Sequence, residues 1–327
     1  MRAIVCTGYG PPEVLQLAEV PRPAPGPDEV LIRVVSTTVH VGDVRIRAFD
    51  VPRGQRIAAR MVLGIRRPKH PILGMELSGV VESVGPAVRG FAVGDEVMAF
   101  TGWAFGAYAE YACLREKPLR SAEKEGMVVH KPATMTFDEA AAGLATGGIT
   151  ALSMLSRADV RSGQEVLVNG ASGSVGTYAV QLATYFGARV TGVCSTTNLG
   201  LVQSLGAETV IDYTQQDVTA GPRNYDVIVD AVGTLDRARA RARLKPGGVR
   251  LDVIRDSRSP GGIRTDDLVF LAGLVDSGVI RAVIDRRYPL EQIVEAHRYV
   301  GQGHKKGHVV ITVADPPSPP TSPPDPT

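Results

Sequence analysis

Apolar and polar positions alternate in short, β-branched runs through the N-terminal part of the chain, and proline or glycine separates one run from the next. The runs lie at residues 1–6, 29–35, 79–84, 95–99 and 108–113. Runs of this length and composition, bounded by turn residues, are typical of β-strands. The pattern predicts an all-β region that ends near residue 115, in the form of a partly open barrel.

Two charged segments interrupt or follow this region. Residues 115–127 carry mixed charges and are expected to be exposed. Residues 51–70 concentrate basic side chains, which are Arg53, Arg56, Arg60, Arg66, Arg67 and Lys69. A solvated loop or short helix explains the second segment simply, and a basic rim that favours acidic substrates is the alternative.

The spacing of apolar positions changes to three and four residues from Phe137 onwards, which predicts a helical stretch that reaches Ala158. Thr136 stands just before this pattern, and Glu139 follows three residues later. A threonine and a glutamate at this spacing are typical of a capping box at a helix N-terminus.

Strands and helices alternate through the rest of the chain. Strands are expected at residues 165–169, 189–193, 209–211 and 226–230, and after a turn at Pro246. Helices are expected at residues 175–186, up to Leu244 and at 266–277. This order predicts a doubly wound parallel sheet. After Val283 come a strand, a helix that Pro289 opens, and a final strand.

The stretch 165–213 contains the clearest functional pattern. A buried strand leads into Gly170, Gly173 and Gly176, and a helical pattern follows and stops at Gly187. A pyrophosphate must approach backbone N–H groups and the positive end of the helix closely, which a Cβ atom would prevent. The last glycine allows helix and strand to pack tightly. An isolated glycine triplet would suit an ordinary turn, but the flanking strand and helix favour dinucleotide binding.

The end of the second strand of this unit indicates which dinucleotide is bound. An acid at this point, about twenty residues beyond the glycines, would grip the free 2′-hydroxyl of NAD. Residues 194–198 instead read CSTTN, and no acid occurs before Glu208. Hydroxyl and amide groups can donate hydrogen bonds to a 2′-phosphate, which an acid would repel. The loop therefore favours NADP.

Composition adds limits to this picture. The chain has 327 residues, which suits two domains, and a net charge of +2, which gives no electrostatic case for nucleic acid or an anionic membrane as the main partner. No apolar run approaches the length of a membrane span, and the first residues lack the apolar core of a signal peptide. A cytoplasmic location is expected.

Three further features have less to say about function. The cysteines, Cys6, Cys113 and Cys194, lie far apart in strand-like runs, so buried free thiols are expected rather than a disulfide or a zinc ribbon. Residues 315–327 are mostly proline and are predicted to be disordered or to form polyproline II. A series of arginines alternates with alanine over residues 237–243, and the pattern alone gives no physical reason for it.

An ordered set of phrases resembles the medium-chain dehydrogenase/reductase superfamily, and specifically its zinc-free quinone oxidoreductase-like branch. These phrases are HPILGMELSGVVESVG (70–85), FAVGDEVMAF (91–100), GAYAEY (106–111), KPATMTFDEAA (131–141), NGASGSVGTYAVQLA (169–183), SLGAETVIDY (204–213) and PLEQIVEAHRYV (289–300). With the sequence around them they cover the chain from residue 1 to near residue 312.

The resemblance implies an α/β chain of two domains. A GroES-like β-barrel catalytic domain would occupy residues 1–130 and be completed by 284–314, and a Rossmann NAD(P)-binding domain would occupy residues 131–283. The implied cofactor contacts are Thr150, Gly170, Ala171, Ser172, Gly173, Ser174, Val175, Gly176, Ser195, Thr196, Asn198 and Tyr213. Tyr213 matches a tyrosine that lies beside the NADP 2′-phosphate, whereas Asn198 falls where relatives commonly carry Lys or Arg.

The resemblance also places four residues on the wall of the nicotinamide cleft between the domains. His40 and Asp43 are the catalytic candidates, and Arg47 and Trp103 are the expected substrate contacts. His40 would donate a hydrogen bond to a carbonyl oxygen or supply a proton, and a purely structural role is its alternative. Asp43 is expected to organise its loop rather than to act as a base.

No zinc is expected. Zinc-dependent relatives hold the catalytic metal with a Cys, a His from a Gly-His-Glu sequence, and a further Cys or Glu. The matching positions here are His40, Met75 and a run of alanines near Ala142. A thioether and an alanine cannot replace an imidazole and a thiolate as zinc ligands.

Without a metal that polarises oxygen, the site suits acceptors that are already activated. The resemblance therefore implies an NADPH-dependent, zinc-independent reductase of quinones or α,β-unsaturated carbonyls. The alternatives are an alcohol dehydrogenase, an enoyl-thioester reductase, or an NADPH-binding regulatory or structural protein with little turnover. Residues 254–265 are shorter than the segment that carries a dimerisation strand in relatives, so a monomer or a weakened homodimer is expected.

Overall fold

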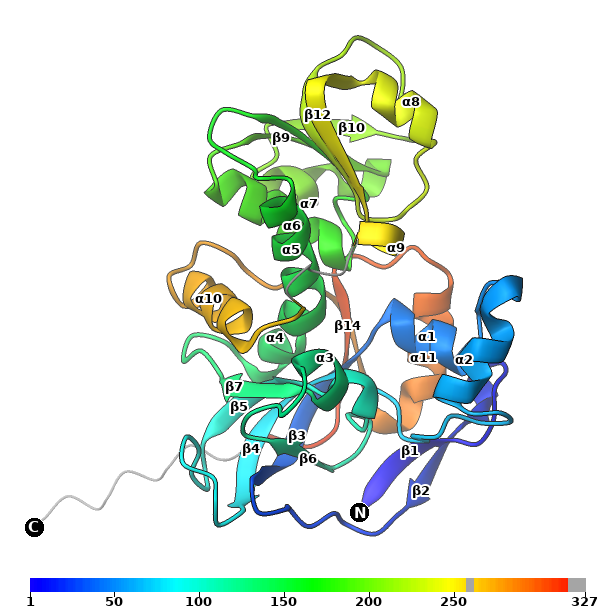
Figure 1. Cartoon of the computed structure of the whole chain (residues 1–327), viewed down its shortest axis with the longest axis vertical. Helices are drawn as coiled ribbons and strands as arrows, with labels where there is room; N and C mark the ends of the chain where they lie inside the picture. The colour runs from blue at the N-terminus through cyan, green and yellow to red at the C-terminus, as the bar shows by residue number, and fades with distance from the viewer. Residues whose placement is uncertain (257–261, 317–327) are drawn as a thin grey trace, which may run out of the picture.

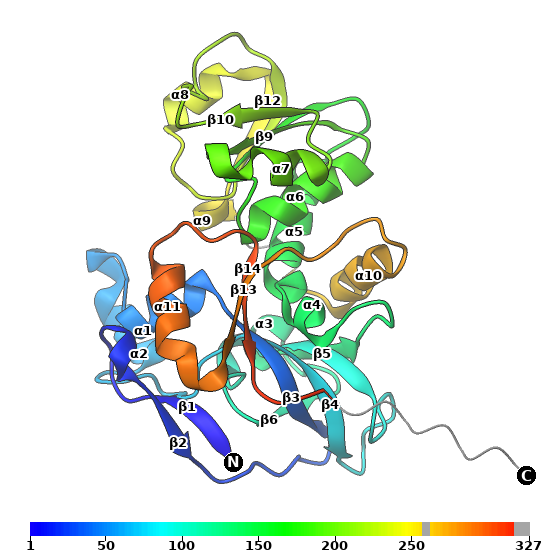
Figure 2. The same ribbon diagram turned by 180° about the vertical axis from the view of Figure 1, so that it is seen from behind.

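Two β-sheets organise the chain into two lobes that are stacked one above the other (Figures 1 and 2). The structure, a computed structural model, describes residues 1–256 and 262–316. The first lobe contains the N-terminal strands together with the last two strands of the chain, and the second lobe contains the strands between them.

A seven-stranded sheet forms the first lobe, with the order β13-β14-β3-β4-β5-β7 and β6 paired to β3. Its strands are β3 (Glu29–Val39), β4 (Glu76–Val84), β5 (Glu96–Phe100), β6 (Tyr111–Arg115), β7 (Met127–His130), β13 (Ile284–Pro289) and β14 (His308–Thr312). β1 (Arg2–Cys6) and β2 (Leu15–Glu19) form a separate antiparallel pair. β14 pairs with β3, so the C-terminal segment completes this sheet.

The helices of the first lobe are α1 (Val41–Ala48), α2 (Arg56–Leu63), α3 (Ala122–Glu125) and α11 (Ile293–Gly301), with short turns η1 (Pro12–Val14), η2 (Arg53–Gln55), η3 (Gly102–Ala104) and η6 (Leu290–Gln292). The charged segment 51–70 therefore contains a short helix, which was one of the two expected forms. Pro289 is the last residue of β13 and the N-cap of η6, which runs directly into α11, so it opens this helical segment as expected.

A five-stranded parallel sheet of order β10-β9-β8-β11-β12 forms the second lobe. Its strands are β8 (Glu165–Asn169), β9 (Arg189–Cys194), β10 (Thr209–Asp212), β11 (Tyr225–Asp230) and β12 (Leu244–Asp252). The chain starts at the centre with β8, moves outward through β9 and β10, and then crosses to β11 on the other side. The order of strands reverses between β8 and β11, which is where open α/β sheets bind ligands.

The helices of the second lobe cover both faces of this sheet. They are η4 (Leu144–Gly148), α5 (Ile149–Arg157), α6 (Ser174–Tyr185), η5 (Thr196–Asn198), α7 (Leu199–Ser204), α8 (Arg237–Ala242), α9 (Val253–Asp256) and α10 (Thr265–Asp276). The short helix α4 (Phe137–Ala141) precedes them and packs on β3 and β4 of the first lobe. Alternate residues of β8 point to opposite faces: Val166 and Val168 pack in the cluster with α5 and α6, and Leu167 packs with α8. The predicted doubly wound sheet is confirmed.

The predicted helix from Phe137 to Ala158 begins as expected but is interrupted. Thr136 Oγ1 accepts from the Glu139 backbone N–H, and the Glu139 carboxylate accepts from the Thr136 N–H at 2.9 Å, so the capping box is confirmed. The helix then breaks at Gly143, which has φ of 76°. A Cβ on Gly143 would lie 1.7 Å from His308 Cε1, so the break makes room for a ring from β14 that the local pattern does not reveal.

Two other expectations need correction. The helix expected to run to Leu244 ends at Ala242, and residues 244–252 form the single strand β12. β12 lies at the edge of the described sheet, where a proline costs no ladder hydrogen bond, so Pro246 can stand inside it. Cys113 is partly exposed, whereas Cys6 and Cys194 are buried, and all three are free thiols.

Two sequence expectations fall largely outside the described residues. These are the disorder of the proline-rich tail, of which residues 317–327 are not described, and the form of the shortened segment around residues 257–261. In the part of the chain that is described, no helix combines the length and apolar character needed to cross a membrane.

Candidate functional site

The glycine turn joins β8 to α6 in the conformation that close approach requires. Gly170 directly follows β8 with φ of 74°, in the left-handed region that favours glycine. Gly173 is the N-cap of α6. A Cβ on Gly176 would lie 2.0 Å from the Gly170 carbonyl oxygen, so the first turn of α6 packs directly on the loop. The unpaired N–H groups of a 12-residue helix therefore start at the end of the central strand.

A pocket of about 660 Å³ opens beside this turn, at the carboxyl ends of β8, β9 and β11. The predicted cofactor contacts that line it are Gly170, Ser172, Gly173, Ser195, Asn198 and Tyr213. The predicted contacts that are not among its lining residues are Thr150, Ala171, Ser174, Val175, Gly176 and Thr196. The pocket lies at the crevice where the strand order reverses, which is the dinucleotide position of this fold.

The pocket also contains residues outside the predicted set of cofactor contacts. They are Asn169, Cys194, Thr197, Val218, Val232, Thr234, Leu235, Gly303, His304, Lys305 and Lys306. Most follow directly from the strand ends, since a residue at the end of a neighbouring parallel strand must border the same crevice. The segment 303–306 is different, because it comes from the return to the first lobe and has no local signal that ties it to the pocket.

Asn198 connects the loop after β9 to the glycine turn. Its Nδ2 donates to Ser172 Oγ at 3.2 Å and to Ser195 Oγ at 3.1 Å, and its buried Oδ1 has no hydrogen-bond partner. Two hydroxyls and an amide therefore meet on the pocket wall. These are the neutral donors that the sequence predicted at this end of the site.

An acid nevertheless reaches this region from the next strand. Asp212 ends β10 and pairs in register with Cys194, the last residue of β9. Its carboxylate accepts from Thr196 Oγ1 at 2.5 Å and from Thr214 Oγ1 at 2.7 Å, and these hydrogen bonds hold the pKa of Asp212 below its ordinary value. The loop 195–198 is free of acids, but the space around it is not, because the parallel register brings Asp212 alongside.

Lys305 is the main site residue that sequence reasoning missed. Its ammonium donates to Ser174 Oγ and to the Gly307 carbonyl oxygen, and among the described residues it forms no ion pair. The residue as a whole is half-buried, but its ammonium end is enclosed by protein. Burial lowers the pKa of Lys305 to about 8, against a smaller opposing effect of Asp285 and Glu76.

The position of this charge matters because Ser174 is the first residue of α6. The N-terminus of a helix attracts anions through its free N–H groups and its dipole. Lys305 adds a full positive charge at the same point. The pocket is thus prepared for a phosphate group at the glycine turn.

His40 and Asp43 form the N-terminal capping box of α1. His40 Nδ1 accepts from the Gly42 N–H at 2.9 Å, and Asp43 Oδ2 accepts from the His40 N–H at 2.9 Å. Burial lowers the pKa of His40 to about 4 and raises the pKa of Asp43 to about 7. His40 is therefore neutral at pH 7, and since Nδ1 is an acceptor its proton lies on Nε2. The capping geometry gives Asp43 an organising role, and a catalytic role for either residue stays a prediction.

The two expected substrate contacts lie apart from the pocket. Arg47 is buried within the first lobe, its Nε and Nη1 have no hydrogen-bond partner, and burial lowers its pKa. Trp103 lies in η3, 44% exposed, with its ring edge-on to Phe105 at a centroid distance of 6.0 Å. The structure does not bring Arg47 to the surface of the cleft, so its contact with a substrate stays a prediction, as does that of Trp103.

Glu76 is a buried carboxyl at the junction of the two lobes. Its Oε2 accepts from Thr38 Oγ1 at 3.0 Å on β3, and its Oε1 accepts from the Thr146 N–H at 2.8 Å in η4. Loss of water raises the pKa of Glu76 to about 7 in spite of these hydrogen bonds. His308 lies at the same junction, and burial holds its pKa well below the ordinary value. The junction between the lobes therefore excludes water although it contains the polar side chains of Glu76 and His308.

The positions that match zinc ligands in metal-dependent relatives do not fit zinc here. A Cβ on Gly42 would lie 2.8 Å from His40 Nδ1 and 3.8 Å from Met75 Sδ, so the thioether stands beside the imidazole. Ala142 is fully buried and offers only its carbonyl oxygen, which accepts from the Tyr178 hydroxyl at 2.8 Å. Over residues 1–256 and 262–316 no group of three or more His, Cys, Asp or Glu could hold a metal ion. An imidazole, a thioether and a methyl group do not make up the nitrogen, thiolate and carboxylate donor set that zinc prefers.

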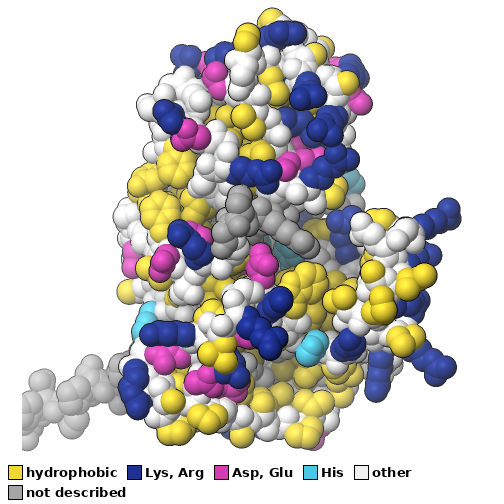
Figure 3. All heavy atoms as spheres, in the orientation of Figure 1, with side chains coloured by type: hydrophobic (Ala, Val, Ile, Leu, Met, Phe, Trp, Pro, Cys, Tyr) yellow, Lys and Arg dark blue, Asp and Glu magenta, His cyan; other side chains and the backbone are white. Residues whose placement is uncertain are grey.

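The basic segment 51–70 forms an exposed projection of the first lobe at α2. Figure 3 shows apolar and basic side chains together in this region, at the right of the view. Its large exposed apolar residues are Ile57, Met61, Val62 and Ile65. The segment stands apart from the cofactor pocket, so a role for its cations at the rim of a substrate site stays a prediction.

Known proteins of similar sequence and structure match almost the whole chain. The alcohol dehydrogenase GroES-like domain matches residues 26–124, and the zinc-binding dehydrogenase model matches residues 205–311. The chain is 32% identical to the chloroplastic NADPH-dependent alkenal/one oxidoreductase of Arabidopsis thaliana and 33% identical to the 2-methylene-furan-3-one reductase of Solanum lycopersicum. Each match covers 95% of this chain and 79% of the relative.

A solved structure extends the match to the arrangement of both lobes. The quinone oxidoreductase from Coxiella burnetii superposes with a TM-score of 0.81 at 28% identity, over 96% of this chain and 99% of that one. The relatives support an enzyme that transfers electrons through a nicotinamide cofactor, in agreement with the pocket at the glycine turn. The chain therefore belongs to the medium-chain dehydrogenase/reductase superfamily, in its quinone oxidoreductase-like branch, and is an oxidoreductase with a GroES-like and a Rossmann domain.

Proposed function

We propose that this enzyme uses NADPH to reduce quinones or α,β-unsaturated carbonyl compounds, and that it does so without zinc. The observation that carries the proposal is an intact dinucleotide pocket in a chain that has Met75 and a buried Ala142 where metal-dependent relatives hold zinc. A hydride donor without a Lewis acid suits an acceptor that conjugation has already activated.

Residues of both lobes would hold the diphosphate of the cofactor. The turn from Gly170 to Gly173 and the start of α6 offer N–H groups, and Lys305 adds a charge beside Ser174. Both features would bind a phosphate group, and neither distinguishes NADPH from NADH. They support a nicotinamide dinucleotide in general.

The loop after β9 supports NADPH in particular. Ser195, Thr197 and Asn198 line the pocket with neutral hydrogen-bonding groups, and Tyr213 stands beside them, 52% exposed. Asp212 does not line the pocket, and its carboxylate is engaged by two threonine hydroxyls. The Arabidopsis relative is named as NADPH-dependent, which agrees with this preference.

Bound NADPH would supply a hydride to the electrophilic carbon of the acceptor. The chain contributes positioning, a dry junction between the lobes, and hydrogen-bond donors for the oxygen on which negative charge develops. His40 is the candidate donor on the first lobe, because its neutral imidazole carries a proton on Nε2. The Nε2–H of neutral His40 would donate a hydrogen bond to the oxygen of the enolate or hydroquinone anion, and that oxygen would then take its proton from solvent.

The three relatives named above share one chemical class of acceptor. An alkenal or alkenone, a 2-methylene-furan-3-one and a quinone each contain a carbonyl group conjugated to a carbon–carbon double bond. This shared feature supports conjugated carbonyls as the substrate class of this chain.

A panel of acceptors tests the proposal. NADPH and NADH oxidation are followed at equal concentrations with a quinone, an enone, an enoyl thioester and a simple aldehyde, with and without a chelator. Reduction of the quinone or enone with NADPH, unchanged by the chelator, is expected. Activity that the chelator abolishes would contradict the zinc-free mechanism, and NADPH binding without turnover of any acceptor would contradict reductase activity.

A pair of variants tests the cofactor preference at the same position. Ser195→Asp adds a carboxylate at the loop after β9, which would repel a 2′-phosphate and accept from a 2′-hydroxyl. It is expected to shift the preference from NADPH toward NADH. Ser195→Ala, the matched control, removes one hydrogen-bonding group and is expected to weaken NADPH binding without favouring NADH. A wild-type preference for NADH would overturn the NADPH assignment.

A further inference from the structure

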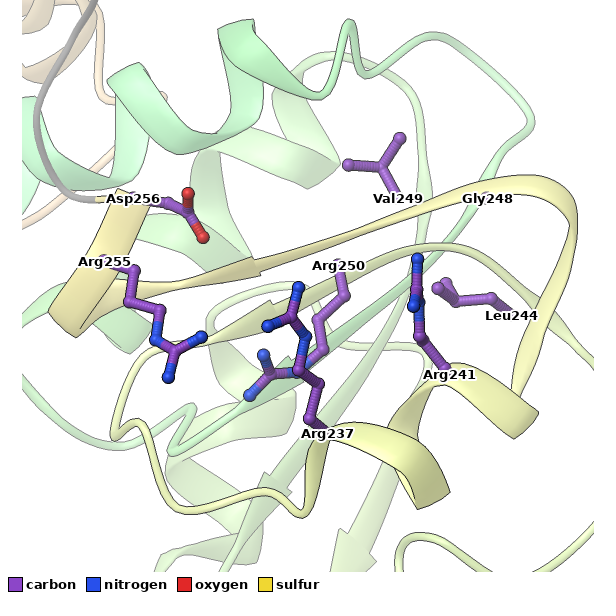
Figure 4. A pocket seen from close by; sticks show the side chains of 8 residues that line it. All are labelled: Arg237, Arg241, Leu244, Gly248, Val249, Arg250, Arg255 and Asp256. Atoms are coloured by element: carbon purple, nitrogen blue, oxygen red, sulfur yellow. The ribbon is translucent and has the colours of Figure 1, made fainter.

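Four arginines surround a second pocket at the outer edge of the Rossmann sheet (Figure 4). The pocket has a volume of about 340 Å³ and lies between α8, β12 and α9. Its lining residues are Arg237, Arg241, Leu244, Gly248, Val249, Arg250, Arg255 and Asp256. None of them lines the cofactor pocket. The volume is in the range of small-molecule sites.

The helix α8 explains the arginine series that had no account from the sequence. Residues four apart lie on one face of a helix, so the series divides into two pairs. Arg239 pairs with Asp217, and Arg243 is buried over the Tyr225 ring and donates to the Val218 carbonyl. Arg237 and Arg241 form the other pair, and both face the pocket (Figure 4).

Three of the four arginines that line the pocket form no ion pair within the described residues. Among residues 1–256 and 262–316, no carboxylate lies within 4.0 Å of the guanidinium groups of Arg237, Arg241 or Arg255. Asp256 is the one acid in the lining, and it pairs with Arg157 at 3.4 Å. Like charges at this helical spacing destabilise a helix. An anion in the pocket would relieve that repulsion.

Arg250 supplies a buried and partly unsatisfied donor at the back of the pocket. Its side chain is 10% exposed and its Nη2 pairs with Asp230 at 3.0 Å and Asp252 at 3.1 Å. Its Nε–H has no hydrogen-bond partner. In Figure 4 the side chains of Arg237, Arg250 and Arg255 reach the same space from three different elements. Positive charge and free N–H donors therefore converge on one cavity.

We propose that this pocket binds a small multivalent phosphate, such as pyrophosphate or a phosphorylated metabolite, at a site separate from the cofactor. Guanidinium groups donate paired hydrogen bonds that match the oxygens of phosphate. A phosphoryl group offers oxygens in several directions, so it can accept from arginines on α8 and α9 together. A carboxylate is planar and singly charged, and it would satisfy one of these guanidinium groups at a time.

The proposed site is close to the cofactor pocket, so the test must separate the two. Arg250 Nη2 also donates to the Leu235 carbonyl oxygen at 3.2 Å, and Leu235 lines the cofactor pocket. Pyrophosphate could therefore compete for the cofactor diphosphate position. Saturation of the protein with NADPH closes that position before the measurement starts.

Calorimetric titration of pyrophosphate into the NADPH-saturated protein is the experiment, at constant ionic strength. Arg237→Ala/Arg241→Ala is expected to weaken binding by about tenfold or more, as loss of charge-assisted hydrogen bonds does. Arg237→Ala alone is compared with Arg239→Ala, which is the matched control because it removes one positive charge from the opposite face of the same helix. Arg239→Ala is expected to leave pyrophosphate affinity unchanged. Arg237→Lys/Arg241→Lys keeps the charge and loses the forked geometry, and it too should bind pyrophosphate more weakly.

Several results would overturn the proposal. Pyrophosphate binding that vanishes on NADPH saturation would assign it to the cofactor pocket. An equal loss in Arg239→Ala would show that general charge, and not the pocket, is responsible. Citrate binding as tightly as pyrophosphate would refute the preference for phosphate. The double alanine variant is expected to bind NADPH as the native protein does, and a matching loss of NADPH affinity would place these arginines in the cofactor site.

Discussion

Lys305→Met provides the sharpest test of the cofactor site. In the free protein, burial holds the pKa of Lys305 at about 8 instead of 10.5. A cofactor phosphate beside the ammonium would favour its charged form and return the pKa toward the ordinary value. A full return of the pKa from about 8 to 10.5 corresponds to about 3.4 kcal/mol, which is the upper limit of the coupling between Lys305 protonation and cofactor binding.

The sign of the pH dependence follows from this shift. A lysine with a lowered pKa is charged below that value and neutral above it, so at pH 7 Lys305 is ready for a phosphate, and above pH 8 it must first take up a proton. NADPH affinity is therefore expected to fall as the pH rises through 8, by about 30-fold between pH 7 and pH 9.5 if the pKa returns fully to 10.5 in the complex.

Fluorescence titration of NADPH over this pH range measures the effect, and calorimetry in buffers of different ionisation enthalpy measures the proton uptake. Lys305→Met is expected to bind NADPH more weakly at pH 7 and to lose the dependence between pH 7 and 9.5. Lys306→Met removes the neighbouring charge and is expected to keep the slope. The reasoning would be refuted by a native affinity that is flat over this range, or by a slope that persists in Lys305→Met.

Four further expectations concern the fold. The difference in free energy of unfolding between Glu76→Gln and the native protein should shift in favour of the variant by about 2–3 kcal/mol from pH 5 to pH 8. The reason is that the pKa of Glu76 is raised to about 7 in the folded protein, so the native protein loses stability as the pH rises through this window, whereas glutamine does not titrate. Urea unfolding at both pH values measures this, and an equal difference at each would contradict it. Thr136→Ala removes the capping box of α4 and should cost about 1 kcal/mol in the same assay. Gly176→Ala puts a Cβ 2.0 Å from the Gly170 carbonyl oxygen, so it should destabilise the protein by about 1–3 kcal/mol and weaken NADPH binding, and unchanged binding would show that the turn can shift freely. Light scattering during gel filtration should show a monomer, since the described sheet ends at β12 beside unpaired arginines, and a stable dimer would contradict this.

Features that depend on neighbours in sequence were predictable. The capping box at Thr136 needs residues three apart, and the strand, glycine turn and helix from β8 to α6 occupy one continuous stretch. Their geometry follows from local sterics and hydrogen bonding, which the sequence states directly. The residue types at Met75 and Ala142 are likewise known from the sequence alone, and neither side chain is an imidazole, a thiolate or a carboxylate.

Contacts between distant segments had to come from the tertiary structure. Asp212 reaches Thr196 only because β10 pairs with β9 in one particular register, and an acid sixteen residues away carries no local sign of that. Gly143 breaks a helical pattern to admit the ring of His308, which arrives from the far end of the chain.

The sequence by itself determined a glycine turn between a strand and a helix, neutral residues at 195–198 after the second strand, and Met75 and Ala142 at the positions compared with zinc ligands. Only the tertiary structure decided which charges act there. Lys305 lines the pocket beside Ser174 because the C-terminal return carries it to the start of α6, where burial lowers its pKa. Arg237 and Arg241 line one pocket because the helical spacing of α8 places them on the face that borders β12 and α9, whereas Arg239 lies on the other face and pairs with Asp217. The sequence shows which residues carry charge. The pKa of each charged group and the ligands it can bind depend on its burial and on its neighbours, and those are determined by packing.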